Sequence, residues 1–197
     1  MTTQKRSVLL IHGIDDTARI FDKMAVYLRD RTGADIHTLN LIPNNGDLGL
    51  DALAWQVKAY VDCHLAHVDR LDLVGFSMGG IVGRYYVQKA GGLHRVNRLI
   101  TLSSPHNGTW TGFLRPNIGA CQMRPHSPFL RTLNRTAHDL QKVKFTSLWT
   151  PYDLMIVPAH SSLLAVGTMV QLPVLAHPLM VSDERSLATV AQKLTTH

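Results

Sequence analysis

The chain has 197 residues and a formal net charge of +6, with eleven histidines and two cysteines. This length suits one compact domain whose core needs no disulfide bonds, and two cysteines exclude a disulfide-rich scaffold. The apolar runs are too short for a membrane span or a signal peptide, and the scattered basic residues match no nucleic-acid-binding motif. We therefore expect a cytoplasmic protein that binds no nucleic acid. Ordinary solubility explains the positive charge better than a preference for anionic membranes or acidic substrates.

Apolar, strand-like runs alternate with helical patterns along the whole chain. We expect strands at Ser7–Ile11, Asp35–Leu41, Leu71–Phe76, Arg98–Leu102, Lys144–Trp149 and Thr168–Val174. Apolar residues at helical spacing predict helices around 21–28, 50–65, 78–89 and 187–194. Nearly continuous hydrophobic strands separated by helices are typical of a mainly parallel sheet covered on both faces. The predicted fold class is α/β, with a single domain over residues 1–197.

The first predicted strand ends in a tight glycine turn, in the run Ile11-His12-Gly13-Ile14-Asp15-Asp16. Such a turn presents a backbone N–H beyond the end of the strand, and we expect it to be that of Ile14. His12 has no second histidine or carboxylate at ligand spacing beside it. A structural role that holds the turn is therefore favoured over a metal site.

The third predicted strand runs directly into the sequence Gly75-Phe76-Ser77-Met78-Gly79, and a helical pattern follows. This is the context that a Gly-x-Ser-x-Gly nucleophile elbow requires: a sharp turn at the serine, with very small residues on both sides. The helix N-terminus stabilises negative charge beside the hydroxyl, and the N–H of Met78 is the second expected oxyanion donor. The competing interpretation is an ordinary glycine-rich turn in which Ser77 caps the helix.

A long irregular stretch from residue 105 to about 142 interrupts the alternation and is rich in proline and glycine. Connections of this length are usually functional or contain small elements of their own. We expect an excursion beside the active-site end, with a short helix after Ser127-Pro128. The sequence leaves two positions open for the apolar residues of this stretch, the rim of an acyl cleft and the edge of the sheet. These residues are Trp110, Phe113, Leu114, Ile118 and Met123. The pairing of Cys63 with Cys121 also stays open.

A nucleophilic serine needs a base, and the base needs an orienting acid. Functional side chains of an α/β sheet lie beyond the carboxyl ends of its strands. Asp153 follows the fifth predicted strand and His177 follows the sixth, in the order that such hydrolases use. Five competing residues are less suitable, because each lies in a loop or at the start of a helix and none follows a late strand: Asp47, Asp51, His106, His160 and Asp183.

These motifs together resemble small bacterial lipases and esterases of the α/β-hydrolase superfamily. The resemblance covers nearly the whole chain, from Ile11-His12-Gly13-Ile14 through the elbow and Leu99-Ile100-Thr101-Leu102 to Asp153-Leu154-Met155-Ile156-Val157. It implies a reduced six-stranded sheet without a large lid, in which the second strand lies outside the first and the third to sixth follow in order. The excursion looks longer than in the smallest lidless members.

The same resemblance implies a serine carboxylic ester hydrolase with a triad of Ser77, Asp153 and His177. Ile14 and Met78 are its implied oxyanion donors. We expect a monomer that acts on a small-molecule or lipid ester, with peripheral contact to lipid surfaces and no metal or organic cofactor. A thioesterase, acyltransferase or phospholipase with the same triad is the alternative enzyme. A non-catalytic ligand-binding protein on a hydrolase scaffold is the alternative outside enzymes.

Overall fold

The computed structural model describes residues 6–196 and contains a six-stranded sheet whose neighbouring strands all pair in parallel. The order in space is β2-β1-β3-β4-β5-β6, which confirms the arrangement expected from the resemblance. Hydrophobic runs bounded by turns form these strands: β1 Ser7–Ile11, β2 Asp35–Leu39, β3 Leu71–Phe76, β4 Val96–Leu102, β5 Lys144–Trp149 and β6 Thr168–Gln171.

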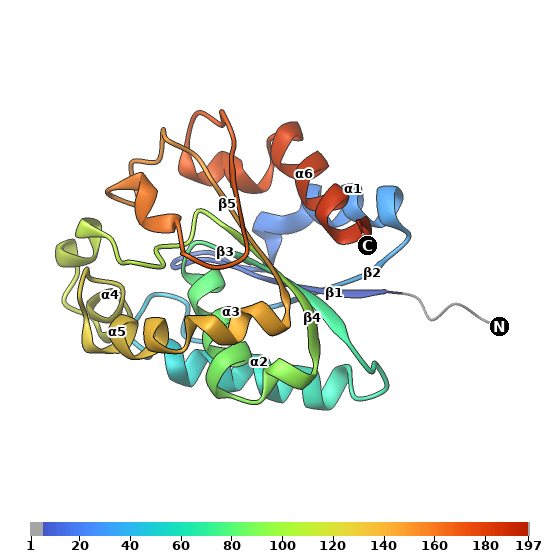
Figure 1. The fold of residues 1–197 in the computed structure, drawn as a ribbon, viewed down its shortest axis with the longest axis horizontal. Helices are drawn as coiled ribbons and strands as arrows, with labels where there is room; N and C mark the ends of the chain where they lie inside the picture. The colour runs from blue at the N-terminus through green and yellow to red at the C-terminus, as the bar shows by residue number, and fades with distance from the viewer. Residues whose placement is uncertain (1–5, 197) are drawn as a thin grey trace.

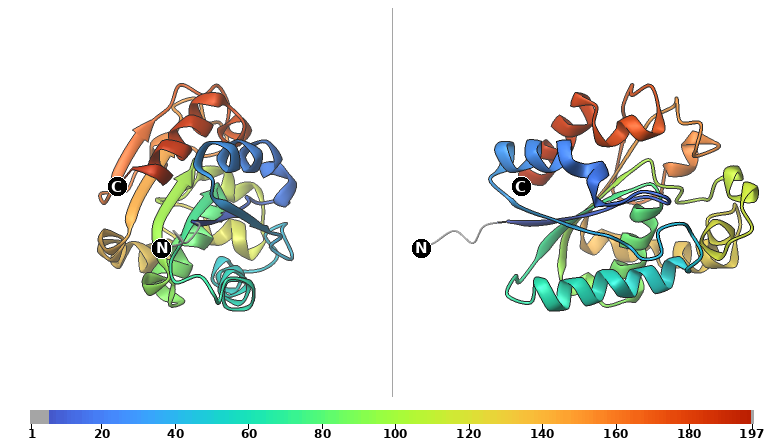
Figure 2. Two further views of the ribbon diagram at one scale, coloured as in Figure 1. Left: turned by 90° about the vertical axis from the view of Figure 1, so that its right-hand side faces the viewer. Right: turned by 180° about the vertical axis from the view of Figure 1, so that it is seen from behind.

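Helices cover both faces of the sheet, as Figure 1 shows. One face carries α1 (Asp22–Thr32) and α6 (Glu184–Thr195), and the other carries α2 (Leu50–His64) and α3 (Met78–Lys89). The view from behind in Figure 2 shows the long α2 along one face and the α1–α6 pair along the other. The predicted α/β fold with two covered faces is confirmed.

The alternation of side chains along β1 divides the interior into two cores. Leu9 and Ile11 are buried against α2 and α3, whereas Val8 and Leu10 are buried against α1 and α6. Successive strand residues point to opposite faces, so a strand covered on both sides must be apolar at every position. This requirement explains why the hydrophobic runs in the sequence are continuous.

Two strands end earlier than predicted, and local hydrogen bonds give the reason. β2 stops at Leu39, and the backbone N–H of Leu41 donates to the His12 ring at 2.9 Å instead of continuing the ladder. β6 stops at Gln171, because Leu172 makes one more bond to β5 and the next residue, Pro173, has no N–H to donate.

The excursion between β4 and β5 contains small helices, including α4 (Ile118–Gln122) and α5 (Pro128–Arg135). Ser127 caps α5 through its side chain at 3.1 Å from the N–H of Leu130, and Pro128 occupies the first turn, so the short helix predicted there is confirmed. Its apolar residues differ in exposure, and the two interpretations stay open for the exposed ones. Met123 is buried, whereas the others remain exposed: Trp110, Phe113, Leu114 and Ile118. Both cysteines are free thiols, so they do not pair.

Candidate active site

Ser77 lies between β3 and α3 in a backbone conformation with positive φ, at φ 53° and ψ −122°. A side chain on Gly75 would overlap the backbone of Gly79 and Gly80, and one on Gly79 would overlap the backbone of Ile11. The turn is therefore possible only with glycine at both positions. A non-glycine residue at positive φ is strained, and such strain persists where the surrounding structure holds it.

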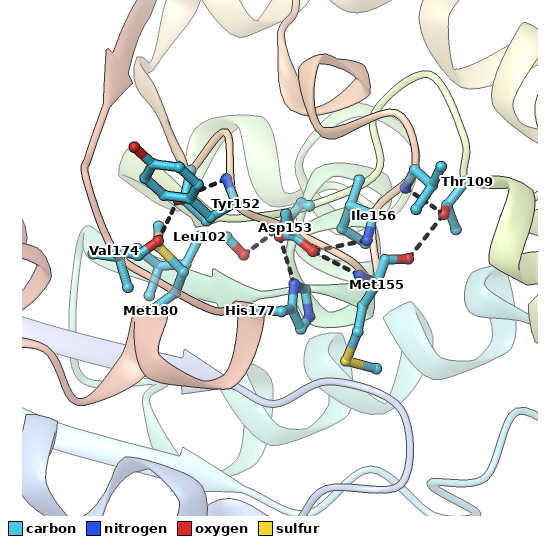
Figure 3. A network of polar contacts seen from close by, with 12 residues as sticks. Leu102, Thr109, Tyr152, Asp153, Met155, Ile156, Val174, His177 and Met180 are labelled. Carbon is cyan, nitrogen blue, oxygen red and sulfur yellow. Dashed lines mark hydrogen bonds and ion pairs between the residues drawn. The ribbon is translucent and has the colours of Figure 1, made fainter.

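His177 and Asp153 form a buried pair beyond the carboxyl ends of β5 and β6, shown in Figure 3. The Nδ1 atom of His177 lies 2.7 Å from Oδ2 of Asp153. The imidazole also packs on Phe76, the residue before Ser77, with 4.7 Å between ring centroids. Since Nδ1 is engaged by the carboxylate, Nε2 is the nitrogen left for a further partner.

Asp153 is held as an anion by its surroundings. Burial raises the pKa of this carboxyl, but the hydrogen bond and charge of His177 and the backbone N–H of Ile156 outweigh burial and lower the pKa below its ordinary value. Oδ1 accepts hydrogen bonds from the backbone N–H groups of Met155 at 3.0 Å and Ile156 at 2.8 Å, which orient the carboxylate toward the imidazole (Figure 3). An ionised, oriented carboxylate is the group that a catalytic histidine needs.

A cavity of about 300 Å³ brings Ser77 and His177 to one space. It opens at the carboxyl ends of the strands, where the turn after β1, the excursion and the loops after β5 and β6 meet. Its remaining lining is mostly apolar: Ile14, Asp15, Asp16, Ile20, Phe76, Thr109, Thr111, Gly112, Arg115, Ala120, Met123, Met155 and Pro178.

The turn after β1 lies beside Ser77. Ile14 lines the cavity, and the following residue is fixed by a 2.9 Å bond from the N–H of Asp15 to the carbonyl of Asn44. Among the hydrogen bonds of residues 6–196, none uses the backbone N–H of Ile14 or Met78 as its donor. Both N–H groups are thus available to an acceptor from outside the protein.

The competing histidines do not reach this cavity. His12 donates from Nδ1 to the Gly13 carbonyl at 2.8 Å and accepts from Leu41 at Nε2, so it holds the turn as expected. His106 is fully buried between Arg84 and Thr101, and His160 is exposed in the loop after β5.

The competing carboxylates have structural roles or lie in solvent. Asp183 caps α6 by accepting from the N–H of Arg185, as its position predicts. Asp51 lies in the first turn of α2 and accepts from Gln122, and Asp47 is exposed in the preceding loop. Among the described residues no cluster of three or more histidine, cysteine or acidic side chains has the arrangement of a metal site.

Two acidic residues of the cavity, Asp15 and Asp16, have no counterpart among the predicted site residues, and of these two only Asp15 has an ion-pair partner within residues 6–196. Asp16 lines the cavity from the turn after β1, three residues beyond Gly13. The only sequence signal for it is that position, at the end of the run that follows the first strand.

A family model of palmitoyl protein thioesterases matches residues 7–152, which include the turn after β1 and the serine elbow. The chain belongs to the palmitoyl protein thioesterase family. The matched region ends one residue before Asp153, so the positions of Asp153 and His177 rest on the geometry described above. No curated protein sequence matches the chain.

Solved structures of lipases share this fold over almost the whole chain. Aspergillus fumigatus lipase B has a TM-score of 0.83 and 19% identity, with 99% of this chain and 54% of that chain covered. This chain therefore spans about half the length of that lipase. The mature form of Bacillus licheniformis lipase BlEst2 has a TM-score of 0.79 and 16% identity, covering 98% of this chain and 93% of that one. The phospholipase PlaB from Legionella pneumophila has a TM-score of 0.66 and 16% identity, covering 80% and 41%.

Family and fold together support a hydrolase with the α/β-hydrolase architecture. Identities this low establish only the shared fold, so they do not assign a substrate to this chain. In residues 6–196, no helix has the length and apolar character that crossing a membrane requires.

Proposed function

We propose that this protein is a serine hydrolase that cleaves acyl esters through an acyl-enzyme intermediate. The observation that carries the proposal is the convergence of a strained Ser77 with the buried His177–Asp153 pair on one cavity. All of these groups come from one chain, which fits a protein that acts as a monomer.

In the proposed reaction, Nε2 of His177 takes the proton of the Ser77 hydroxyl as its oxygen attacks the acyl carbonyl. Asp153 holds the ring through Nδ1 and stabilises the imidazolium that forms. The imidazolium then gives its proton to the leaving group, and the acyl group stays on Ser77. Attack by water, with His177 again as base, releases the acid and restores the serine.

The negative oxygen of each tetrahedral intermediate needs hydrogen-bond donors that are already in place. We assign this role to the backbone N–H groups of Ile14 and Met78, for which no acceptor exists among the described residues. Loss of one such donor lowers kcat by about 10²–10³ in well-studied hydrolases. The N-terminus of α3 adds a favourable dipole at the same place.

The rim of the cavity favours an apolar acyl substrate. Thr109 and Thr111 donate to the carbonyl of Met155 at 2.9 and 2.7 Å, which ties the excursion to the loop after β5. Exposed apolar side chains lie in the excursion, in the loop after β5 and in the loop after β6: Trp110, Phe113, Leu114, Leu154, Leu175 and Leu179. Exposed apolar groups around a site favour contact with an apolar substrate or a lipid surface.

A thioesterase activity is the second candidate, and the family match is the observation that favours it. The same nucleophile, base and oxyanion donors serve oxyesters and thioesters, so the two activities need not exclude one another. Rates on an oxyester and a thioester of the same acid, measured side by side, decide which one the protein prefers. Phospholipids and an acceptor alcohol, added in turn, test phospholipase and acyltransferase activity.

The replacement Ser77→Ala tests the proposed function. We expect the wild type to hydrolyse nitrophenyl esters and to form one covalent adduct with a fluorophosphonate, detected by intact-protein mass spectrometry. Ser77→Ala should form no adduct and lose at least about 10⁴-fold in kcat. Ser182→Ala, which changes a serine outside the cavity, is the matched control and should keep both properties. An unlabelled wild type without esterase activity would favour the non-catalytic binding protein.

A further inference from the structure

Asp16 lies beside the nucleophile, and Gly13 makes this approach possible. The point that a Cβ on Gly13 would occupy is 2.9 Å from Oδ2 of Asp16 and 3.1 Å from Cβ of Ser77. The carboxylate and the serine therefore both adjoin Gly13, and a side chain at this position would meet both of them. Both residues line the same cavity.

The negative charge of Asp16 is not balanced by a neighbouring cation. Asp15 forms an ion pair with Arg115 at the cavity mouth, so these two lining residues neutralise one another. No side chain among residues 6–196 donates a hydrogen bond to the carboxylate of Asp16, and no salt bridge there includes it. The cavity thus carries one uncompensated carboxylate, although the whole chain has a net charge of +6.

Asp16 also shares the cavity with His177, the proposed base. Burial raises the pKa of its carboxyl, and the charges of His12 and His177 oppose this rise. Both groups line one cavity, and the proposed role of His177 is to deliver a proton to the leaving group, so we expect the carboxylate to act on that group. The apolar lining formed by Ala120 and Met123 in the excursion is the natural place for the acyl chain.

We propose that Asp16 is a specificity-determining residue that selects leaving groups carrying a positive charge or hydrogen-bond donors and rejects those carrying a negative charge. This inference rests on the proposed acyl hydrolase function. The unpaired carboxylate attracts a cationic or hydroxylated leaving group in a partly desolvated space and repels an anionic one. Asp15 cannot act in the same way, because Arg115 already neutralises it.

Three octanoyl esters of two-carbon alcohols test the proposal, because the acyl group and the two-carbon unit are the same and the terminal group is cationic, neutral or anionic. They are the esters of choline, ethylene glycol and isethionate, and proton release in a pH-stat gives kcat/KM for each. We expect the wild type to prefer them in that order. In Asp16→Asn the choline-to-isethionate ratio should fall on the order of tenfold, the size of effect that one nearby charge produces. Asp16→Glu keeps the charge and should keep the order.

Asp47→Asn is the matched control, because it removes the same charge from an exposed loop outside the cavity. It should leave the ratio at the wild-type value. A ratio that is unchanged in Asp16→Asn, or that falls equally in Asp47→Asn, would overturn the inference while leaving the hydrolase function intact. A wild type that hydrolyses none of the three esters would overturn both.

A second measurement distinguishes this role from a merely structural one. The charged and titratable groups that affect Asp16 are His12, His177 and Asp15, and Arg115, the partner of Asp15, lines the same cavity. Asp16→Asn removes a negative charge from the cavity that contains the proposed base, and a nearby negative charge favours the protonated form of a base. Asp16→Asn should therefore move the acid limb of the pH profile of kcat/KM to lower pH. An acid limb that does not move contradicts the placement of Asp16 beside the base.

Discussion

His177 and His106 are two buried histidines of one chain with opposite surroundings. His177 is 3% exposed, lines the cavity and contacts the carboxylate of Asp153, whereas His106 is 0% exposed and contacts the guanidinium of Arg84. Both follow the carboxyl end of a strand, and both have a proline beside them in the sequence. Burial and position in the chain therefore do not separate a proposed base from a structural residue.

The hydrogen bonds of the two rings make the distinction. His106 uses both nitrogens inside the protein, because Nδ1 accepts from Arg84 at 3.3 Å and Nε2 lies 3.0 Å from the hydroxyl of Thr101. His177 engages only Nδ1 among the described residues, so Nε2 is left for the substrate reaction. A histidine can act as a base only when one nitrogen remains free to take a proton.

The charge of the partner also distinguishes the two histidines, because His106 contacts a cation and His177 contacts a carboxylate. Burial and the nearby charge of Arg84 lower the pKa of His106 well below its ordinary value, which keeps this ring neutral. Burial also lowers the pKa of Arg84 to about 9. Arg84 bonds to neutral partners, Gln88 and Asn134 at 3.0 Å each, and so joins α3 to α5 of the excursion. Arg84 and His106 thus hold α3, the helix that follows the nucleophile, whereas His177 lines the cavity.

The largest expected effect is on catalysis, and it should come from His177 alone. His177→Ala should lower kcat on a nitrophenyl ester by about 10⁴–10⁶, because the serine loses the base that accepts its proton. His160→Ala, which truncates an exposed histidine outside the cavity, should keep activity close to that of the wild type. Retention of a tenth or more of the wild-type kcat in His177→Ala would remove His177 from the proposed mechanism.

His106 should show the reverse pattern, with an effect on stability. His106→Ala leaves a cavity and deprives the buried Arg84 of an acceptor, so we expect the free energy of unfolding to fall by about 3 kcal/mol. Urea titration followed by circular dichroism measures this change, and kcat per folded molecule should stay within a few-fold of the wild type. A large loss of kcat without a loss of stability would place His106 in the chemistry.

The smallest effect concerns the pH dependence of stability. Burial lowers the pKa of His106 and of His12, so below about pH 6.5 the unfolded chain binds protons that the folded chain does not. The free energy of unfolding therefore falls as the pH falls through this range. His106→Asn keeps an acceptor for Arg84 but cannot titrate, and the loss of stability between about pH 6.5 and 5.5 should shrink by about 1 kcal/mol. Equal losses in the two proteins would contradict a neutral His106.

Most of the sheet and the elbow were predictable, because they depend on residues close together in the chain. Continuous apolar runs indicate strands buried on both faces, and the glycines around Ser77 indicate a turn that excludes side chains. The ends of β2 and β6 were less predictable, since the end of β2 depends on a bond to His12, 29 residues from Leu41.

The sequence by itself determined the strands, the glycine turn around Ser77 and the loops that contain Asp153 and His177, because hydrophobic period and turn chemistry are local properties, and the resemblance supplied the order of the strands in the sheet. Only the tertiary structure decided which charges meet. The ion pair of Asp15 with Arg115 joins residues 100 positions apart, and that pairing leaves Asp16 unbalanced beside the nucleophile. Electrostatic energy depends on distance in space and on burial, and neither quantity exists until the chain has folded.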